Sequence, residues 1–136
     1  MPDVFTKAKR SEVMALIRAK NTKPELTVRR ALHRLGYRFR LHDPRLPGRP
    51  DIVLKKHRLI IEVKGCFWHS HRCLKGRLPV DNHAYWSAKL ERNLQRDRRK
   101  ARLWRALGWR VASVWECDVR RLPADRLELR LSRLLG

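Results

Sequence analysis

The alternation of apolar and polar residues along the 136-residue chain predicts helices interleaved with short strands. A helix is expected over Thr22–Leu35, because Thr22 can cap its first turn and Glu25 follows three residues later. Pro24 suits the start of a helix, and Gly36 suits the left-handed position after its end. The segment therefore carries both a start signal and a stop signal.

Four segments have the pattern of strands. Tyr37–Leu41 alternates large apolar residues with arginine, which is the period of a half-buried strand. Asp51–Leu54 and Arg58–Val63 are short runs rich in β-branched residues, and Lys55–His57 between them predicts a turn. The two runs are therefore expected to form a hairpin. Trp109–Glu116 alternates again and predicts a further strand.

The remaining periodic segments predict helices. A short one is expected over Glu12–Lys20, a long one over Tyr85–Leu107 with Gly108 after its end, and a closing one over Pro123–Leu135. The combination indicates an α/β fold in which a small mixed sheet is flanked by helices. The length fits a single domain over residues 1–136, with residues 1–20 as an N-terminal arm.

The charge of the chain indicates a polyanionic partner. Lysine and arginine total 34 against 13 acidic residues, a formal net charge of +21. A small domain needs only about 2–8 net charges for solubility, so this excess favours contact with nucleic acid. A ribosomal-type composition bias is the alternative. The first residues hold no apolar run typical of a secretion signal, so we expect a soluble cytoplasmic protein.

The hairpin carries the central chemical motif. Asp51 opens one strand, and Glu62 and Lys64 stand two residues apart near the end of the other, so both should face the same side near Asp51. Two carboxylates there would bind Mg²⁺ through oxygen, with the carbonyl of Val63 as a further ligand. Lys64 would stabilise charge on a phosphate or orient a water. The pattern matches the PD-(D/E)xK nuclease motif; a surface hairpin with scattered charges is the alternative.

All three cysteines lie in or within reach of one His-rich loop. Cys66 and Cys73 enclose His69 and His71, and Cys117 ends the later predicted strand. Three thiolates and one imidazole make a closed tetrahedral Zn²⁺ site of the structural kind, with His71 or His69 as the imidazole. Two reduced core cysteines and a reactive loop thiol are the alternative, and an odd cysteine count argues against a disulfide framework.

Three longer motifs resemble one known family. Leu46–Asp51, Gly65–His69 and Gly108–Val111 followed by Val114–Cys117 are similar to the very short patch repair (Vsr) endonucleases. The likeness covers nearly the whole chain, from Lys7 near the start. It implies a restriction-endonuclease-like fold and an enzyme that nicks one strand of DNA on the 5′ side of the thymine of a T:G mismatch. Such mismatches arise when 5-methylcytosine is deaminated.

The resemblance also assigns roles to individual residues. It implies that Asp51 binds the catalytic metal, that His69 is catalytic, and that Glu25 and Asp97 are supporting polar residues. It chooses His71 as the histidine ligand of zinc. The zinc ligands it implies are Cys66, His71, Cys73 and Cys117. An aromatic wedge that enters DNA beside the mismatch, with one residue inserted from the N-terminal arm, is implied for Phe67, Trp68 and Trp86, and for Met14.

The residues themselves support part of these assignments. Phe67 and Trp68 lie in a polar loop, where large aromatic side chains either pack on a zinc site or stack on bases. Asp97 shares a helical stripe with Leu90, Leu94, Ala101 and Trp104, so it should point inward and need a partner, His69 or a structural arginine. By spacing alone, Trp86 and Met14 fit a core equally well or better.

The chain departs from the family pattern at the nuclease motif. The best-studied members have no acidic residue at the position of Glu62 and carry Thr-His where this chain has Val63-Lys64. The general base therefore stays open between Lys64, His69 and a water on a second metal. Two other functions stay open as well: a PD-(D/E)xK endonuclease with a different target, and a zinc-bearing module that only binds DNA.

The expected partner is double-stranded DNA with a T:G mismatch. The family implies mismatch-repair proteins and a repair DNA polymerase as further partners. One nick requires one active site, so we expect a monomer, and the longest uncharged apolar run, Leu59–Ile61, is too short for a membrane span.

Overall fold

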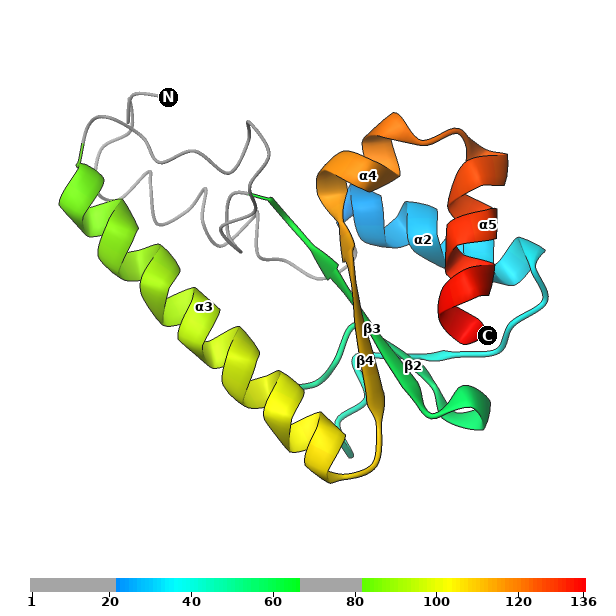
Figure 1. The fold of residues 1–136 in the computed structure, drawn as a ribbon, viewed down its shortest axis with the longest axis horizontal. Helices are drawn as coiled ribbons and strands as arrows, with labels where there is room; N and C mark the ends of the chain where they lie inside the picture. Colours follow the sequence, from blue (N-terminus) through cyan, green and yellow to red (C-terminus); the bar gives the residue numbers. More distant parts are fainter. Residues whose placement is uncertain (1–21, 67–81) are drawn as a thin grey trace.

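In the described part of the computed structural model, a four-stranded sheet separates one long helix from three shorter ones (Figure 1). The structure describes residues 22–66 and 82–136. The strands lie in the order β1-β2-β3-β4. Their bounds are Arg40–Leu41 for β1, Ile52–Leu54 for β2, Leu59–Lys64 for β3 and Arg110–Trp115 for β4. The mixed sheet flanked by helices confirms the predicted α/β class.

The predicted hairpin is present. β2 and β3 pair antiparallel, with Ile52 opposite Ile61, and a 3-10 turn over Lys55–His57 joins them. Arg58 closes this turn in the left-handed region at φ 51°. β4 then pairs with β3 in parallel, which requires a long crossover connection, and helix α3 lies within it.

The first described helix, α2, spans Lys23–Arg34 and begins as predicted. The Thr22 hydroxyl accepts a hydrogen bond from the amide of Glu25 at 3.4 Å, and Pro24 lies in the first turn. Gly36 follows the helix at φ 83°, the conformation that its position predicted. The predicted helix over residues 12–20 lies outside the described residues.

Two other helices confirm their predictions, and one helix was missed. α3 spans His83–Ala106 and α5 spans Ala124–Leu135. The predicted strand over Trp109–Glu116 ends at Trp115, because Glu116 starts a short helix, α4, over Glu116–Arg121. Acidic residues in its first turn and arginines in its last turn complement the helix dipole. In a segment of only six residues this charge pattern is a weak sequence signal.

The predicted strand over Tyr37–Leu41 is also shorter in the structure, where only Arg40 and Leu41 pair with β2. β2 has three residues, so it offers few partners for a longer neighbour. Tyr37 and Phe39 instead pack on the core as partly buried residues. The alternation therefore predicted a half-buried segment correctly, but it predicted more paired strand residues than the structure has.

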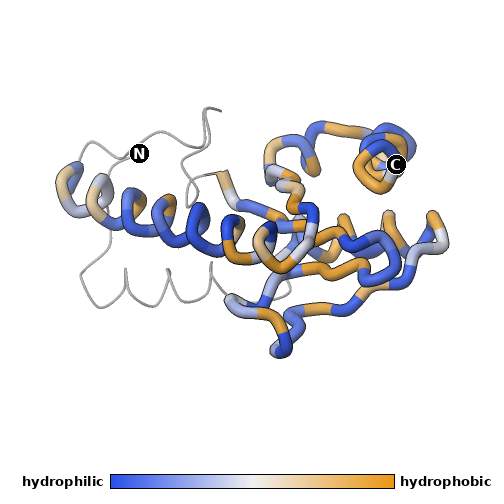
Figure 2. Tube along the Cα trace, turned by 60° about the horizontal axis from the view of Figure 1, so that its bottom comes forward, coloured by the Kyte–Doolittle hydropathy of each residue, from blue (hydrophilic) through white to orange (hydrophobic). Residues whose placement is uncertain are grey.

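The two faces of the sheet carry different amounts of apolar packing. The larger cluster lies between the sheet and helices α2, α4 and α5, and includes Leu32, Ile61 and Leu131, each with no exposed surface. The smaller cluster, on the α3 side, consists of Val53, Ile60 and Trp104 with a few partly buried neighbours. Figure 2 shows α3 as mostly hydrophilic along its length.

No helix in residues 22–66 and 82–136 is long and apolar enough to cross a membrane.

Candidate active site

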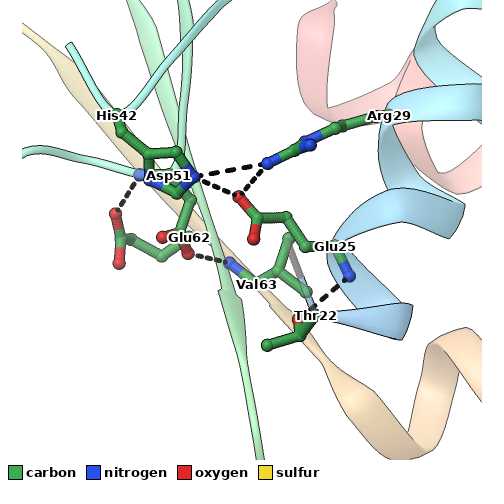
Figure 3. Close-up of polar contacts among 7 residues, drawn as sticks. All are labelled: Thr22, Glu25, Arg29, His42, Asp51, Glu62 and Val63. Atoms are coloured by element: carbon green, nitrogen blue, oxygen red, sulfur yellow. Dashed lines mark hydrogen bonds and ion pairs between the residues drawn. The ribbon is translucent and has the colours of Figure 1, made fainter. Parts of the chain in front are cut away.

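Asp51 and Glu62 meet at the open end of the β2–β3 hairpin. The Asp51 amide donates to Oε1 of Glu62 at 3.0 Å, and the Val63 amide donates to Oδ2 of Asp51 at 2.9 Å (Figure 3). Each carboxylate thus binds the backbone of the opposite strand just beyond the last ladder pair. The predicted convergence of these two side chains is present, and we name this arrangement the carboxylate clamp.

The clamp holds two carboxyl groups close together at a half-buried position. Burial and, secondarily, the neighbouring Asp51 carboxylate raise the pKa of Glu62 from 4.5 to about 8. The hydrogen bond from the Asp51 amide and the charges of Lys100 and Lys64 pull this pKa back down by smaller amounts. A raised pKa from burial beside a second carboxylate is typical of sites that bind a cation or exchange a proton.

A second polar group adjoins Asp51 from helix α2. Oε1 of Glu25, which is 3% exposed, lies 2.9 Å from Nη2 of Arg29 and 3.1 Å from Nε2 of His42 (Figure 3). The Thr22 cap fixes the turn that carries Glu25. The family resemblance assigned Glu25 a supporting role, and the structure places its carboxylate next to Asp51.

His42 and Arg29 were missed by the sequence analysis. His42 is a lone histidine in a loop, and its position next to Asp51 depends on a left-handed backbone at φ 46° and on its amide, which donates to the Asp51 carbonyl at 3.2 Å. No local pattern signals this. Arg29, in contrast, stands four residues after Glu25 on a predicted helix, and that spacing could have indicated the ion pair.

The site has donor atoms suited to a divalent cation. One ligand atom from each of Glu25, His42 and Asp51 lies within 4.8 Å of the others. Two carboxylates and an imidazole fit a divalent first-row metal, and carboxylates alone fit Mg²⁺. The Asp51–Glu62–Val63 set predicted for Mg²⁺ shares Asp51 with this group.

Helix α3 holds the segment that precedes Asp51. Nε1 of Trp104 donates to the carbonyl of Pro47 at 2.7 Å, and Pro50 is fully buried. The turn residues Leu46 to Pro50 thus pack against α3 and lead directly to Asp51 of the clamp.

The predicted inward position of Asp97 is confirmed in part, because the residue is half-buried. Asn93, rather than Leu94, belongs to the buried stripe of α3.

Lys64 extends from β3 beyond Glu62. Its ammonium lies 5.6 Å from the centre of the Trp115 ring, on the neighbouring strand, in a cation–π contact. The predicted common face of Glu62 and Lys64 agrees with the alternation of β3. Its role in catalysis stays a prediction.

Two of the four predicted zinc ligands come together. The amide of Cys117, in the first turn of α4, donates to Sγ of the buried Cys66 at 3.4 Å. The two residues are 51 positions apart in the chain, so the fold itself creates this contact. His71 and Cys73 lie outside the described residues.

The predicted wedge residues are only partly covered by the structure. Trp86 lies in the first turn of α3 and is 6% exposed, so its ring would have to leave this packing to enter a duplex. Met14, Phe67, Trp68 and His69 lie outside the described residues. The wedge stays a prediction.

Comparison with known proteins identifies the family. Residues 2–75 match the family model described as DNA mismatch endonuclease Vsr. The chain is 50% identical over 135 residues to the type II nicking enzyme V.XorIIP of Xanthomonas oryzae pv. oryzae, covering 99% of this chain and 98% of that one. It is 42% identical over 135 residues to V.NmeAIP of Neisseria meningitidis, covering 99% and 95%. It is 42% identical over 120 residues to the DNA mismatch endonuclease Vsr of Escherichia coli K12, covering 88% and 77%. The chain belongs to the Vsr family of endonucleases and is thereby a DNA-acting nuclease.

Proposed function

We propose that this enzyme nicks one strand of double-stranded DNA on the 5′ side of the thymine in a T:G mismatch, in a Mg²⁺-dependent hydrolysis that starts repair of deaminated 5-methylcytosine. The observation that carries the proposal is the carboxylate clamp of Asp51 and Glu62 in a member of the Vsr family. The net charge of +21 supports a DNA substrate.

The residues at the clamp fit a hard divalent cation. The carboxylates of Asp51 and Glu62 and the carbonyl of Val63 would hold Mg²⁺, which supplies Lewis-acid polarisation of a phosphate oxygen and acidifies a water when bound. Glu25 and His42 would orient groups around Asp51 through the contacts they already make. Lys64 would donate to a phosphate oxygen, and His69 and Asp97 would complete the proton transfers.

The second cofactor we propose is a structural Zn²⁺ held by Cys66, His71, Cys73 and Cys117. Support comes from the contact between the Cys117 amide and the Cys66 sulfur, since hydrogen bonds to sulfur accompany thiolate ligation. Zinc at this point would join the loop after β3 to the start of α4. The loop would then be fixed relative to the clamp.

We assign mismatch recognition to aromatic residues that follow the nuclease motif in the chain. Phe67 and Trp68 come directly after Cys66, three and four residues after Lys64. With Trp86 and Met14 they would separate a base step, which costs a few kcal/mol and costs least where a pair is already mismatched. A T:G pair would therefore be opened more readily than the matched duplex around it.

A second candidate is a PD-(D/E)xK endonuclease that nicks DNA at another target. Two observations favour it. This chain has the complete Glu62-Val63-Lys64 motif, and several of its relatives, including V.XorIIP and V.NmeAIP, are named type II nicking enzymes.

The two candidates differ in what they do to matched DNA. Purified protein is incubated with Mg²⁺ and two duplexes of one sequence, with a T:G or a C:G pair at the centre. The proposed function predicts faster nicking of the T:G duplex by at least about tenfold, the discrimination expected of one altered base pair. Equal nicking of both duplexes would reject mismatch specificity and favour the second candidate.

A further inference from the structure

Lys100 occupies an inward position on helix α3. The buried residues Trp86, Leu90, Asn93 and Trp104 follow one stripe of this helix, and Lys100 lies on it, seven residues after Asn93 and four before Trp104. The side chain is half-buried. A lysine in such a position buries its hydrocarbon stem and keeps its ammonium at a polar site or in water.

The stem of Lys100 is fixed against the segment that leads to Asp51. A methyl group placed on Gly48 would lie 3.0 Å from both Cδ and Cε of Lys100, so the stem runs directly along this glycine. Gly48 has φ 77°, and the neighbouring Pro47 carbonyl is bound to Trp104 one turn further along α3. A side chain at position 48 would obstruct the path of the lysine.

Lys100 lies close enough to the clamp for its positive charge to interact with the Glu62 carboxylate. The ammonium of Lys64 lies over the Trp115 ring. Within residues 22–66 and 82–136 no hydrogen bond or ion pair occupies the ammonium of Lys100.

We propose that Lys100 is a second cation of the cutting centre, which contacts the scissile phosphate from α3 while Lys64 approaches from β3. The inference rests on the proposed phosphodiester hydrolysis. In that reaction an oxygen of water bonds to phosphorus, the bond from phosphorus to one sugar oxygen breaks, and the departing oxygen gains a proton. Negative charge grows on the non-bridging oxygens, and a positioned ammonium lowers the energy of that state.

A purely electrostatic role is the alternative. In this alternative, Lys100 only offsets the charge of Asp51 and Glu62 in the absence of a cation. Removing its charge would then strengthen Mg²⁺ binding and leave the rate at saturating Mg²⁺ unchanged. If Lys100 contacts the phosphate, the rate at saturating Mg²⁺ falls instead, because saturating metal does not replace the lost hydrogen-bond donor.

The test is a Mg²⁺ titration of single-turnover nicking on the duplex that the wild type cuts. Lys100→Met keeps the stem beside Gly48, and we expect its rate at saturating Mg²⁺ to fall by about 10²–10³-fold, as for loss of one oxyanion donor. Lys100→Arg keeps a cation and should retain a rate clearly above that of Lys100→Met. Lys56→Met is the matched control, because Lys56 is exposed in the turn at the other end of the hairpin, and it should keep the wild-type rate.

Two results would overturn the inference. One is a wild-type rate for Lys100→Met at saturating Mg²⁺ with half-saturation at lower Mg²⁺, the signature of charge neutralisation alone. The other is an equal loss of rate and of unfolding free energy in Lys100→Met and Lys100→Arg, which would mark a packing role. A wild-type protein that nicks neither matched nor mismatched DNA would refute the proposed function instead.

Discussion

On the face of the sheet covered by α2, α4 and α5, strand β3 contributes Leu59 and Ile61 to a large apolar cluster. Helix α3 covers the other face (Figure 1). There the same strand contributes Ile60 to a small cluster, and by the alternation of the strand Glu62 and Lys64 follow on the same side. One strand thus supplies alternate residues to two different environments. The first environment is mainly apolar, and the second contains the Glu62 carboxyl of the clamp.

The difference indicates how stability and chemistry are divided. Burial of the larger cluster, between the sheet and α2, α4 and α5, stabilises the fold by the hydrophobic effect, which needs no charged partner. The α3 side keeps a carboxylate at Glu62 whose pKa is raised to about 8 by burial and by Asp51, and this opposes folding when the group is ionised. Functional sites in proteins often carry such a cost, and the rest of the fold offsets it.

The largest effect on activity is expected at the clamp. Asp51→Asn removes the carboxylate charge, and loss of a metal ligand should lower the nicking rate by about 10³-fold or more. The asparagine oxygen can still accept from the Val63 amide, so the unfolding free energy should change by less than about 1 kcal/mol. Nicking kinetics and urea unfolding measured on the same preparation check both parts. A rate within twofold, roughly, of wild type would remove Asp51 from the chemistry.

On the other face of the sheet, we expect a mutation to lower stability and leave the nicking rate unchanged. Ile61→Ala empties a fully buried site in the larger cluster and should reduce the unfolding free energy by about 2–5 kcal/mol. Ile61→Val is the matched control, with an expected loss of about 0.5–1.5 kcal/mol. The nicking rate per folded molecule should stay near wild type in both variants. A rate that falls as steeply as in Asp51→Asn would show that the two faces are not separable.

The pH dependence of stability tests the contribution of the Glu62 carboxyl separately from the apolar packing on the α3 side. The Glu62 carboxyl binds its proton more tightly in the folded chain than at the ordinary pKa of 4.5, so its contribution to stability is full below 4.5. It is lost as the pH rises through about 8. Without divalent metal, wild type should therefore become less stable relative to Glu62→Gln between pH 4.5 and pH 8. Parallel stability profiles in urea unfolding would contradict this assignment.

The smallest effect is expected at the start of α2. Thr22→Ala removes the acceptor of the 3.4 Å bond from the Glu25 amide and should cost about 0.5–1 kcal/mol, at the low end for a helix cap because the bond is long. Thr27→Ala is the control, since its hydroxyl only donates back to the Lys23 carbonyl, and its loss should be near neutral. A thermal unfolding curve separates the two. An equal response would mean that the cap contributes nothing.

Local patterns predicted most of the fold. The Thr22 cap, the glycines after α2 and α3, and the β2–β3 hairpin each carry a short-range signal that the structure confirms. Predictions that depended on neighbours were less accurate. β1 is two residues long because β2 offers little to pair with, and Cys117 lies in α4 rather than at the end of a strand.

The site shows the same division. Asp51, Glu62 and Lys64 are predictable because the period of a strand and one turn bring them together. His42 and Lys100 are not, because a left-handed loop residue places the first and the packing of α3 against Gly48 places the second. The expected stripe of α3 included Leu90, Leu94 and Trp104, and the structure buries Asn93 instead of Leu94.

The most direct measurement of the central claim is strand-resolved mapping of the nick in a duplex with a single T:G pair. Each strand is labelled in turn, and the products are sized after reaction with Mg²⁺ and the wild-type enzyme. The account predicts one new end, on the thymine strand immediately 5′ to the mismatched thymine, no cut in the guanine strand, and nicking of the C:G duplex that is slower by at least about tenfold. Cuts in both strands, or nicking of the C:G duplex at an equal rate, would contradict it.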